Sequence, residues 1–269
     1  VATPYFVFVP VVDQKQADVG YPSPGILTSS VDTGMDVIMV YEMMIDQVFG
    51  FAVRKDSPIK SIKDFPGHTI SVWDIGWQVI IDPILIEAGI DPKSITYVPV
   101  GAQWGQAVSQ GKADIALTWL ALAPQWEAVG LGLRYFYGEE FSKMPANGYC
   151  ARKSDLKDPA KKALLAKFLK ATSMGIHFAR HNPRAAAQIT YSKFAAVREQ
   201  MKPELALKSM QELHWGYTAG VRKGEGYGWF EKTGWSTYLD IIAKLGQTKR
   251  TLTLDETITN ELIKEANNF

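Results

Sequence analysis

Short apolar runs alternate with helix-like segments between residues 37 and 118. Runs rich in β-branched and aromatic residues predict strands at 37–41, 49–53, 69–73, 95–98 and 113–118. Amphipathic segments predict helices over 78–88 and 103–110, and Gly89 and Gly111 stand where the C-terminal caps of these helices belong. From residue 69 the order is strand, helix, strand, helix, strand, which is typical of a parallel sheet with helices on its faces.

The residues after Cys150 follow a helical pattern. Asp158-Pro159 and Asn182-Pro183 each supply an N-cap and a proline in the first turn, so helices are predicted over 159–180 and from 183 onward. Further helices are predicted over 203–212, 235–245 and 255–267. Residues 216–234 hold six glycines and several aromatic residues, which favours an ordered loop region. The fold class is therefore predicted as α/β.

Two similar segments flank the unit of alternating strands and helices. Residues 50–55, Gly-Phe-Ala-Val-Arg-Lys, resemble residues 148–153, Gly-Tyr-Cys-Ala-Arg-Lys. A chain that leaves one lobe, builds a second and returns needs two adjacent crossing strands, so these segments are predicted to form a two-strand hinge. Lobe one would then hold residues 1–54 and 150–269, and lobe two residues 55–149. The alternative is a chance similarity of two strand ends.

A second pair of similar segments points to an incomplete first lobe. Residues 17–20, Ala-Asp-Val-Gly, resemble residues 113–116, Ala-Asp-Ile-Ala, and an aromatic loop follows each. The sheet unit takes 45 positions from Thr69 to Asp114 but only 17 from Val1 to Asp18, so the first lobe is about 28 residues short. This difference predicts a chain break or a missing segment near Lys15-Gln16.

Four segments together resemble a known family. They are Gln-Ala-Asp-Val-Gly at 16–20, Phe-Ala-Val-Arg-Lys at 51–55, Ser-Ile-Lys-Asp-Phe-Pro-Gly-His-Thr-Ile-Ser-Val at 61–72, and Gly-Lys-Ala-Asp-Ile-Ala at 111–116. In this order they are similar to substrate-binding proteins of bacterial ABC importers, in the NMT1-like group that binds nitrate, taurine, aliphatic sulfonates and thiamine precursors. The resemblance implies a two-lobed, type II periplasmic-binding-protein fold, a small-molecule solute held in a cleft between the lobes, and an ABC permease as the membrane partner.

The composition excludes several other classes of partner and site. The formal net charge is +1, from 29 Lys and Arg against 28 Asp and Glu, which argues against nucleic acid or an anionic membrane surface. Cys150 is the only cysteine, so no internal disulfide and no multi-cysteine metal site is expected. No apolar run approaches the roughly 20 residues of a membrane span. We expect a soluble monomer without a cofactor, and the resemblance implies a periplasmic or extracytoplasmic location, with any signal peptide removed ahead of Val1.

The loops after the strands are the candidate ligand sites, because ligands of open α/β sheets lie beyond the carboxyl ends of the strands. The five loops considered are residues 4–8, 21–24, 41–42, 73–77 and 118–120. Aromatic residues recur in all five and suit a preformed pocket for a small organic molecule. Any one of these rings is equally compatible with core or hinge packing. The predicted ligand-binding residues are Tyr5, Phe6, Tyr21, Pro22, Ser23, Glu42, Trp73, Asp74, Gly76, Trp77, Thr118, Trp119 and Tyr149.

The same loops contain two acids, Asp74 and Glu42, and no Lys or Arg. A small, hard anion is usually held by an arginine fork, so the loops favour a planar or aromatic solute with an amine or amide, oriented by either acid. A small organic anion stays open as an alternative, because Gly76 begins a helix whose free backbone N–H groups could hold it.

Catalytic patterns are weak. His177 and His181 are four residues apart on one helix face, but no acid or cysteine stands in the metalloprotease positions between or just beyond them. Ser23 lacks the nucleophile-elbow pattern. We therefore expect no catalysis. The alternatives are a pyrimidine-precursor enzyme on the same fold, for which a single cysteine is unusual, and the effector domain of a transcription regulator, which would need a helix-turn-helix ahead of Val1.

Overall fold

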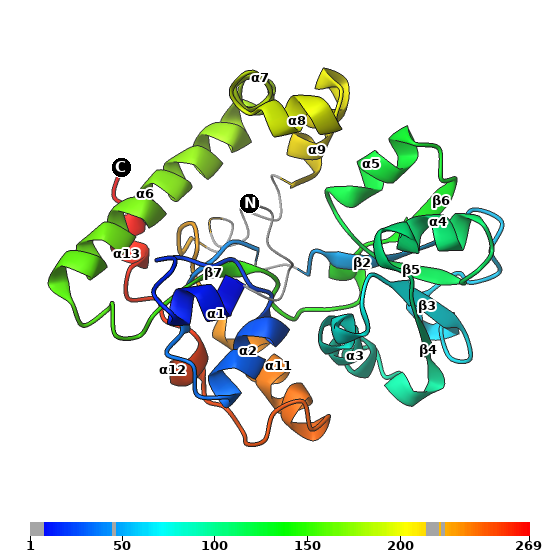
Figure 1. Ribbon diagram of the computed structural model, residues 1–269, viewed down its shortest axis with the longest axis horizontal. Coiled ribbons are helices and arrows are strands. Elements are labelled where there is room, and N and C mark those ends of the chain that lie inside the picture. The colour runs from blue at the N-terminus through cyan, green and yellow to red at the C-terminus, as the bar shows by residue number, and fades with distance from the viewer. Residues whose placement is uncertain (1–7, 45–46, 214–220, 222–223) are drawn as a thin grey trace. The chain divides into compact units, whose positions relative to one another are not determined.

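The computed structural model describes residues 8–44, 47–213, 221 and 224–269 (Figure 1). Two compact units divide the chain. Unit 1 comprises Val1–Asp46, Met144–His177 and Gly216–Phe269, and unit 2 comprises Gln47–Lys143 and Phe178–Trp215. The predicted lobes placed all of residues 150–269 in lobe one, whereas the described residues 178–213 are grouped with unit 2. Residues 216–220 and 222–223 of the loop region predicted over 216–234 lie outside the described residues.

Unit 2 is built on a five-stranded sheet in the order β4-β3-β5-β2-β6. The strands are β2 (Phe49–Arg54), β3 (Thr69–Val72), β4 (Thr96–Pro99), β5 (Ile115–Trp119) and β6 (Leu133–Phe136). Strand β3 pairs in parallel with β4 and β5, while β2 pairs antiparallel with β5 and β6. The predicted alternation of strands and helices with a parallel sheet is thus confirmed.

Local signals set the boundaries of these elements. Helix α3 (Gln78–Glu87) and helix α4 (Trp104–Ser109) are followed by Gly89 and Gly111, whose φ angles of 79° and 71° suit glycine. The Asp114 carboxylate accepts hydrogen bonds from the Thr69 backbone N–H at 2.9 Å and from the Thr69 hydroxyl at 2.8 Å. These bonds align the starts of β3 and β5, so that both strands end at the same edge of the sheet.

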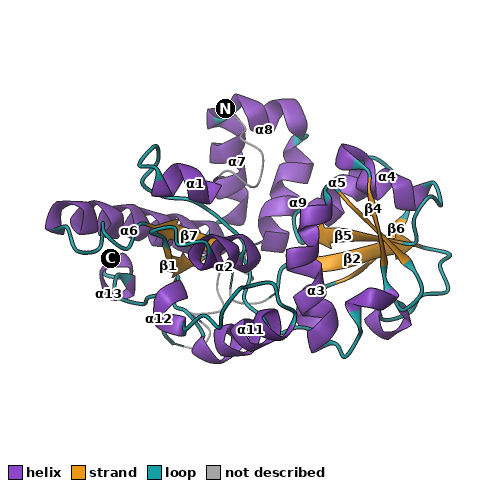
Figure 2. Ribbon diagram, turned by 60° about the horizontal axis from the view of Figure 1, so that its bottom comes forward, coloured by secondary structure: helices purple, strands orange, loops and turns teal. Residues whose placement is uncertain are grey.

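Helices from two stretches of the chain complete unit 2 (Figure 2). Helix α5 (Leu122–Ala128) follows β5, whereas α7 (Pro183–Lys193), α8 (Ala195–Gln200) and α9 (Pro203–Leu213) come later in the sequence. Helix α9 contacts both α7 and α5. The Lys208 ammonium on α9 lies 2.6 Å from the Glu127 carboxylate on α5. Residues 178–213 are therefore anchored to unit 2 by packing and by an ion pair.

Unit 1 contains a small antiparallel sheet of β1 (Ile38–Glu42) and β7 (Gly148–Ala151). Its helices are α1 (Phe8–Asp13), α2 (Pro24–Asp32), α6 (Pro159–His181), α11 (Lys232–Lys244), α12 (Leu254–Thr257) and α13 (Ile263–Ala266). Leu165, Leu169 and Ile176 lie on one face of α6 and are buried in a core that also contains Val40 and Ile263. The last four residues of α6 are grouped with unit 2.

Three predictions about connections are wrong. Residues 49–54 and 148–153 do not form a two-strand hinge, because β2 pairs with β5 and β6 whereas β7 pairs with β1. The helix predicted over 255–267 is two short helices, α12 and α13. Between them Asn260 Oδ1 accepts a hydrogen bond from the Phe230 backbone N–H at 2.9 Å, so this residue serves a tertiary contact.

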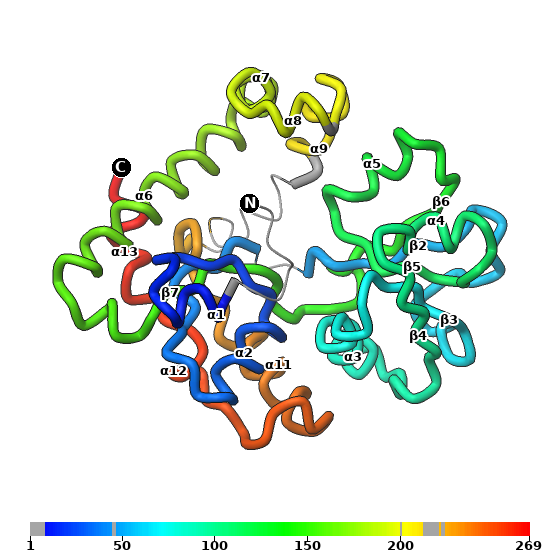
Figure 3. Tube along the Cα trace, viewed as in Figure 1, coloured from blue at the N-terminus to red at the C-terminus, as the bar shows by residue number. Residues whose placement is uncertain are grey.

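The third error concerns the chain break predicted near Lys15-Gln16, whereas the alternative, a segment missing from the sequence, stays a prediction. The trace passes continuously from α1 towards α2 (Figure 3), and the backbone N–H groups of Gln16 and Ala17 both donate to the Val11 carbonyl oxygen, at 2.8 and 3.1 Å. Lys15 adopts a φ of 63°, which lets the chain reverse direction within this turn. The described part of unit 1 nevertheless has two named strands, whereas unit 2 has five. The smaller sheet agrees with the expectation that the first lobe is shorter than the second.

Candidate functional site

Five tryptophans gather at the carboxyl ends of β3 and β5 in unit 2. Trp73 and Trp77 follow β3, Trp119 ends β5, and Trp104 and Trp126 come from α4 and α5. The Trp104 ring lies at the centre of the group, with ring centroids 5.4 to 5.9 Å from those of the other four. The sequence predicted Trp73, Trp77 and Trp119 for this site and missed Trp104 and Trp126.

The five tryptophan rings differ in burial. Trp77, Trp104 and Trp126 are only 6 to 8% exposed, and the Trp104 Nε1–H donates to the Leu117 carbonyl oxygen at 2.7 Å. They form the packed base of the cluster. Trp73 is 44% exposed and Trp119 is partly exposed, so these two rings are the members with surface free for a ligand.

Thr118 precedes Trp119 in β5 and adds a buried polar group near the carboxyl end of this strand. Its side chain is 2% exposed, and within the described part of the chain its hydroxyl has no hydrogen-bond partner. Buried hydroxyl groups are normally satisfied, since an unmade hydrogen bond destabilises the folded protein. Thr118 is therefore a position where a ligand or a bound water would supply the missing partner.

Asp74 and Gly76 act together at the start of the helical segment after β3. The Asp74 carboxylate accepts a hydrogen bond from the Gly76 backbone N–H at 2.8 Å and thereby caps the 3-10 turn Ile75–Trp77. The N–H group that was predicted to be available to an anion is occupied by the protein's own acid. The prediction that this helix start holds an anion stays a prediction, and such an anion would lie beside the Asp74 carboxylate.

Unit 1 has its own aromatic cluster, where residues 20–22 run beside β7. The Tyr21 and Tyr149 rings have centroids 5.3 Å apart, and Tyr41 lies 6.2 Å from Tyr149. Phe168 on α6 meets the Tyr149 ring edge-on at 5.2 Å and is 40% exposed. Burial raises the pKa of Tyr149, so its phenol stays neutral and acts as a hydrogen-bonding group. Phe168 was not predicted from the sequence.

Ser23 and Asn147 place polar atoms beside this cluster. The Gly148 N–H donates to the Pro22 carbonyl oxygen at 3.3 Å, and Ser23 and Asn147 are the next residues along these two antiparallel segments. Ser23 is 3% exposed, precedes α2 and does not cap that helix. Within the described residues, neither Ser23 Oγ nor Asn147 Oδ1 has a hydrogen-bond partner. The arrangement resembles that of Thr118 in unit 2.

Glu42 is buried, and its carboxylate serves the packing of unit 1. One oxygen accepts a hydrogen bond from the Trp235 Nε1–H at 2.6 Å, and the other accepts from the Glu231 backbone N–H at 3.2 Å. These contacts join β1 to the start of α11. The prediction that Glu42 orients a solute amine stays untested, but any such contact would be shared with these two donors.

Groups suited to covalent or metal chemistry are scarce in the described residues. The Cys150 thiol is fully buried, and this burial raises its pKa to about 12, far from the range of a reactive thiolate. The His177 ring is hydrogen-bonded to the Tyr227 hydroxyl through Nδ1 at 3.1 Å. Over the ranges that the structure describes, no three His, Cys, Asp or Glu side chains are placed to share a metal ion.

The predicted site residues thus divide between the two units. Unit 2 brings together Trp73, Asp74, Gly76, Trp77, Thr118 and Trp119, and unit 1 brings together Tyr21, Pro22, Ser23 and Tyr149. Tyr5 and Phe6 lie outside the described residues. No helix of the described chain is both long enough and apolar enough to cross a membrane.

Solved structures with this fold include several periplasmic binding proteins. The aliphatic sulphonate binding protein SsuA of Escherichia coli is 14% identical, with a TM-score of 0.71 over 96% of this chain and 80% of that protein. The alkanesulfonate-binding SsuA of Xanthomonas axonopodis pv. citri, bound to MOPS, is 10% identical, with a TM-score of 0.69 over 93% and 83%.

A variant of DszB in complex with biphenyl-2-sulfinic acid is 12% identical, with a TM-score of 0.63 over 95% of this chain and 87% of that protein. No curated protein matches the chain. The family model described as NMT1/THI5 like matches residues 6–186, which is more than half of the sequence. The fold is that of the periplasmic binding proteins, the resemblance found in the sequence is confirmed, and the chain belongs to the NMT1/THI5-like family.

Proposed function

We propose that this chain is an extracytoplasmic solute-binding protein that captures a small organic molecule and delivers it to an ABC importer. The observation that carries the proposal is a set of three buried polar atoms, Ser23 Oγ and Asn147 Oδ1 in unit 1 and Thr118 Oγ1 in unit 2, which have no partner within the described chain. Each lies within two residues, along the chain, of a ring in one of the two aromatic clusters: Thr118 of Trp119, Ser23 of Tyr21 and Asn147 of Tyr149. A ligand with hydrogen-bonding groups and a flat apolar face would satisfy both features.

The chemistry of these groups favours a planar or heteroaromatic solute that bears an amine or amide. Hydroxyl and carboxamide groups exchange neutral hydrogen bonds, and Trp73 and Trp119 offer partly exposed rings for stacking. Asp74 has a carboxylate beside Trp73, where a solute amine would find a negative charge. The predicted loops contain no Lys or Arg to hold a small, hard anion.

A small organic anion is the second candidate. Helix α2 has nine residues and begins with Pro24, which has no N–H, so the first N–H groups at this end are those of Gly25 and Ile26. Ser23, whose hydroxyl has no partner within the described residues, directly precedes them. Two proteins of the same fold are described as binding an alkanesulfonate or a sulfinic acid, and the second of these ligands carries aromatic rings. An acid with a flat apolar body would use the same aromatic residues as the favoured amine.

The test begins with native mass spectrometry of the purified protein, which detects a retained solute. Calorimetric titration with aminopyrimidine and with taurine then distinguishes the two solute classes. We expect Trp119→Ala and Ser23→Ala to weaken binding by roughly tenfold, which corresponds to about 1.4 kcal/mol. The control is Phe194→Ala, since Phe194 is 60% exposed in unit 2 and lies outside the predicted loops.

Two results would count against the proposal. Tight taurine binding that is unaffected by Trp73→Ala and Trp119→Ala would overturn the favoured solute class and retain the transport function. The absence of any retained or titrated small molecule would overturn solute binding itself. Delivery to a membrane permease, a monomeric state and an extracytoplasmic location belong to the same proposal. Uptake assays in cells that lack the gene test delivery, sedimentation analysis tests the monomeric state, and cell fractionation tests the location.

A further inference from the structure

Residues 17–22 of unit 1 run beside β7 and are bonded to it through the backbone at Gly20 and Pro22. The Gly20 N–H donates to the Cys150 carbonyl oxygen at 3.0 Å, and the Cys150 N–H donates to the Gly20 carbonyl oxygen at 2.9 Å. The Gly148 N–H reaches the Pro22 carbonyl oxygen at 3.3 Å. Strand β1 occupies the opposite edge of β7. This segment ends at Tyr21 and Pro22, directly before Ser23, so its register sets where these ligand-binding candidates lie.

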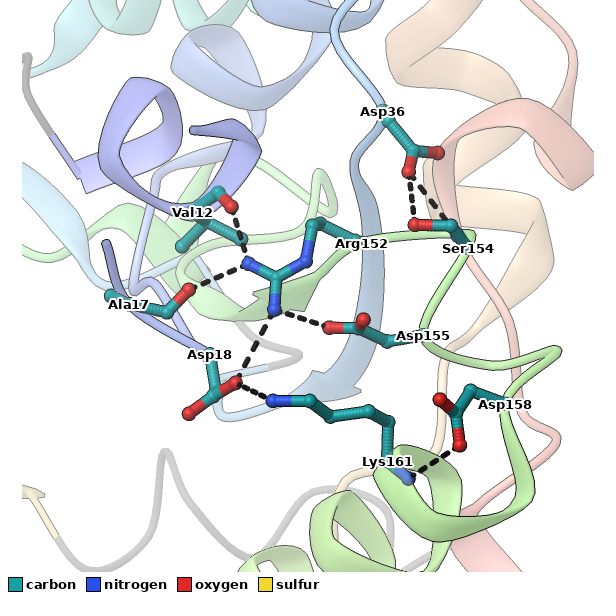
Figure 4. A network of polar contacts seen from close by, with 9 residues as sticks. All are labelled: Val12, Ala17, Asp18, Asp36, Arg152, Ser154, Asp155, Asp158 and Lys161. Carbon is teal, nitrogen blue, oxygen red and sulfur yellow. Dashed lines mark hydrogen bonds and ion pairs between the residues drawn. The ribbon is translucent and has the colours of Figure 1, made fainter. Parts of the chain in front are cut away.

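Arg152 holds the other end of the same segment (Figure 4). Its side chain follows β7 and is only 4% exposed. The guanidinium Nη1 donates to the carbonyl oxygens of Val12 and Ala17, at 2.5 and 2.7 Å. Its Nη2 lies 2.6 Å from the Asp155 carboxylate and 3.3 Å from that of Asp18. A buried guanidinium with four acceptors fixes their relative positions, because its donors lie in one rigid plane.

Lys161 reinforces this arrangement from a second element. Its ammonium on α6 donates to Asp18 Oδ1 at 2.8 Å, the same oxygen that faces Arg152. The pKa of Asp18 is lowered by these cations, with the hydrogen bond from Lys161 as the largest cause. Asp18 therefore stays charged at neutral pH and connects residues 17–22 to both β7 and α6.

We propose that Arg152 is a positioning residue that fixes the register of residues 17–22 on β7, and so places Tyr21 against Tyr149 and Ser23 beside Asn147. A short edge segment with three backbone hydrogen bonds specifies its register weakly, and a slip by one residue would turn Tyr21 to the other face. Arg152 prevents the slip, because Ala17 and Asp18 meet the guanidinium in one register only. The effect on the ligand site rests on the proposed function, whereas the effect on register does not.

Cys150 is a built-in reporter for this register. It is the only cysteine of the chain, its side chain is fully buried, and its backbone pairs with Gly20. A thiol reagent such as iodoacetamide can reach it only when residues around β7 open. The labelling rate at a fixed pH, together with amide exchange at Gly20, Gly148 and Cys150, therefore measures local opening in the absence of any solute.

The decisive comparison is between Arg152→Met and Arg250→Met. Arg250 is also in unit 1 and pairs with Glu256 at 2.7 Å, so the control removes an arginine–carboxylate ion pair that is exposed and does not contact residues 17–22. We expect Arg152→Met to speed Cys150 labelling by at least about tenfold, with faster amide exchange confined to residues next to β7, and Arg250→Met to match the wild type. Asp18→Asn, which keeps the shape of the side chain, should give a smaller increase and serves if Arg152→Met does not fold.

Binding of aminopyrimidine and taurine by the same variants links the register to the ligand site. We expect weaker binding by Arg152→Met and wild-type binding by Arg250→Met. Unchanged labelling in both Arg152→Met and Asp18→Asn would overturn the inference, as would faster exchange spread evenly over β5 and the other elements of unit 2. Because labelling needs no solute, a failure of the proposed function would leave this result intact.

Discussion

Buried hydroxyl groups in this protein are of two kinds, and substitution separates them. Thr118 is 2% exposed and its hydroxyl has no described partner, whereas Thr28 is equally buried and its hydroxyl donates to the Pro24 carbonyl oxygen at 3.0 Å. Valine has nearly the same shape as threonine. We expect Thr118→Val to leave the free energy of unfolding unchanged or to raise it by about 1 kcal/mol, and Thr28→Val to lower it by a similar amount.

Solute binding should respond in the opposite order. Thr118→Val should weaken solute binding about tenfold, because the hydroxyl is proposed to bond the solute, while Thr28→Val should bind normally. Urea unfolding and calorimetry measure the two quantities. A loss of stability in Thr118→Val as large as that in Thr28→Val would show that the hydroxyl has a structural partner.

Helices α4 and α5 meet through a residue that has no side chain. A Cβ atom at Gly105 would lie 2.6 Å from the Trp126 ring, closer than any van der Waals contact permits. Gly105→Ala should therefore displace Trp126 from Trp104, lower the free energy of unfolding of unit 2 by roughly 1 to 3 kcal/mol, and alter the near-ultraviolet circular dichroism of the tryptophan cluster.

Gly175 provides the matched control for this substitution. It lies in α6 with no atom within 4 Å of the position that a Cβ would take. Gly175→Ala should raise the free energy of unfolding by about 0.5 to 1 kcal/mol, since alanine favours the helix. If Gly105→Ala were equally harmless, the close packing of Trp126 on α4 would be refuted.

The short helix α12 carries a pH-dependent cap. The Glu256 carboxylate accepts a hydrogen bond from Arg250 and another from the Thr253 backbone N–H, and these contacts lower the pKa of Glu256 to about 2. Its ordinary value is about 4.3. A carboxylate whose pKa is lowered by folding stabilises the folded state at every pH above its ordinary pKa. This stabilisation is lost as the pH falls from about 4.3 towards 2.

Unfolding by urea over this pH window tests the cap. Glu256→Gln should remove this part of the pH dependence, so that the difference between variant and wild type shrinks as the pH approaches 2. Arg250→Met removes the largest cause of the shift and should move the loss of stability to higher pH. A difference that is the same at pH 7 and pH 2 would contradict the assignment.

A bound solute should stabilise the protein as a whole by mass action. At a free concentration about 100 times the dissociation constant, a ligand that binds only the folded state adds about 2.7 kcal/mol to the free energy of unfolding. The two units can be followed separately, because five of the eight tryptophans lie in the cluster of unit 2 and Cys150 reports on unit 1. Stabilisation of one unit alone would assign the solute to that unit.

Local signals explain what the sequence predicted correctly. Glycines after α3 and α4, and compact apolar runs for β3, β4 and β5, define elements within a few neighbouring residues. Local signals do not predict which strands pair, because the similarity of residues 50–55 to 148–153 carries no information about their neighbours in the sheet. Strand β2 joins β5 and β6, whose paired residues lie 62 to 85 positions later in the chain, so long-range packing decided against the hinge.

The candidate site was predicted only in part, because some of its residues follow strands in the sequence and others are brought in by long-range packing. The rule that ligands lie beyond the carboxyl ends of strands found Trp73, Trp77 and Trp119, and applied to β4 it would also have found Trp104. Asn147 precedes a strand instead of following one, so the rule does not reach it. Phe168 lies inside a long helix, and only the folded structure brings its ring against Tyr149.

The path of the chain also sets an order of events during synthesis. Strands β2 to β6 lie within residues 49–136, whereas the core of unit 1 joins residues 38–41 to residues 262–266. A growing chain can therefore complete the larger sheet while the last helices of unit 1 are still being made. On the ribosome, residues 17–42 are made long before residues 262–266, with which they complete the core of unit 1. Pulse proteolysis of stalled nascent chains should therefore show protease-resistant fragments of unit 2 first.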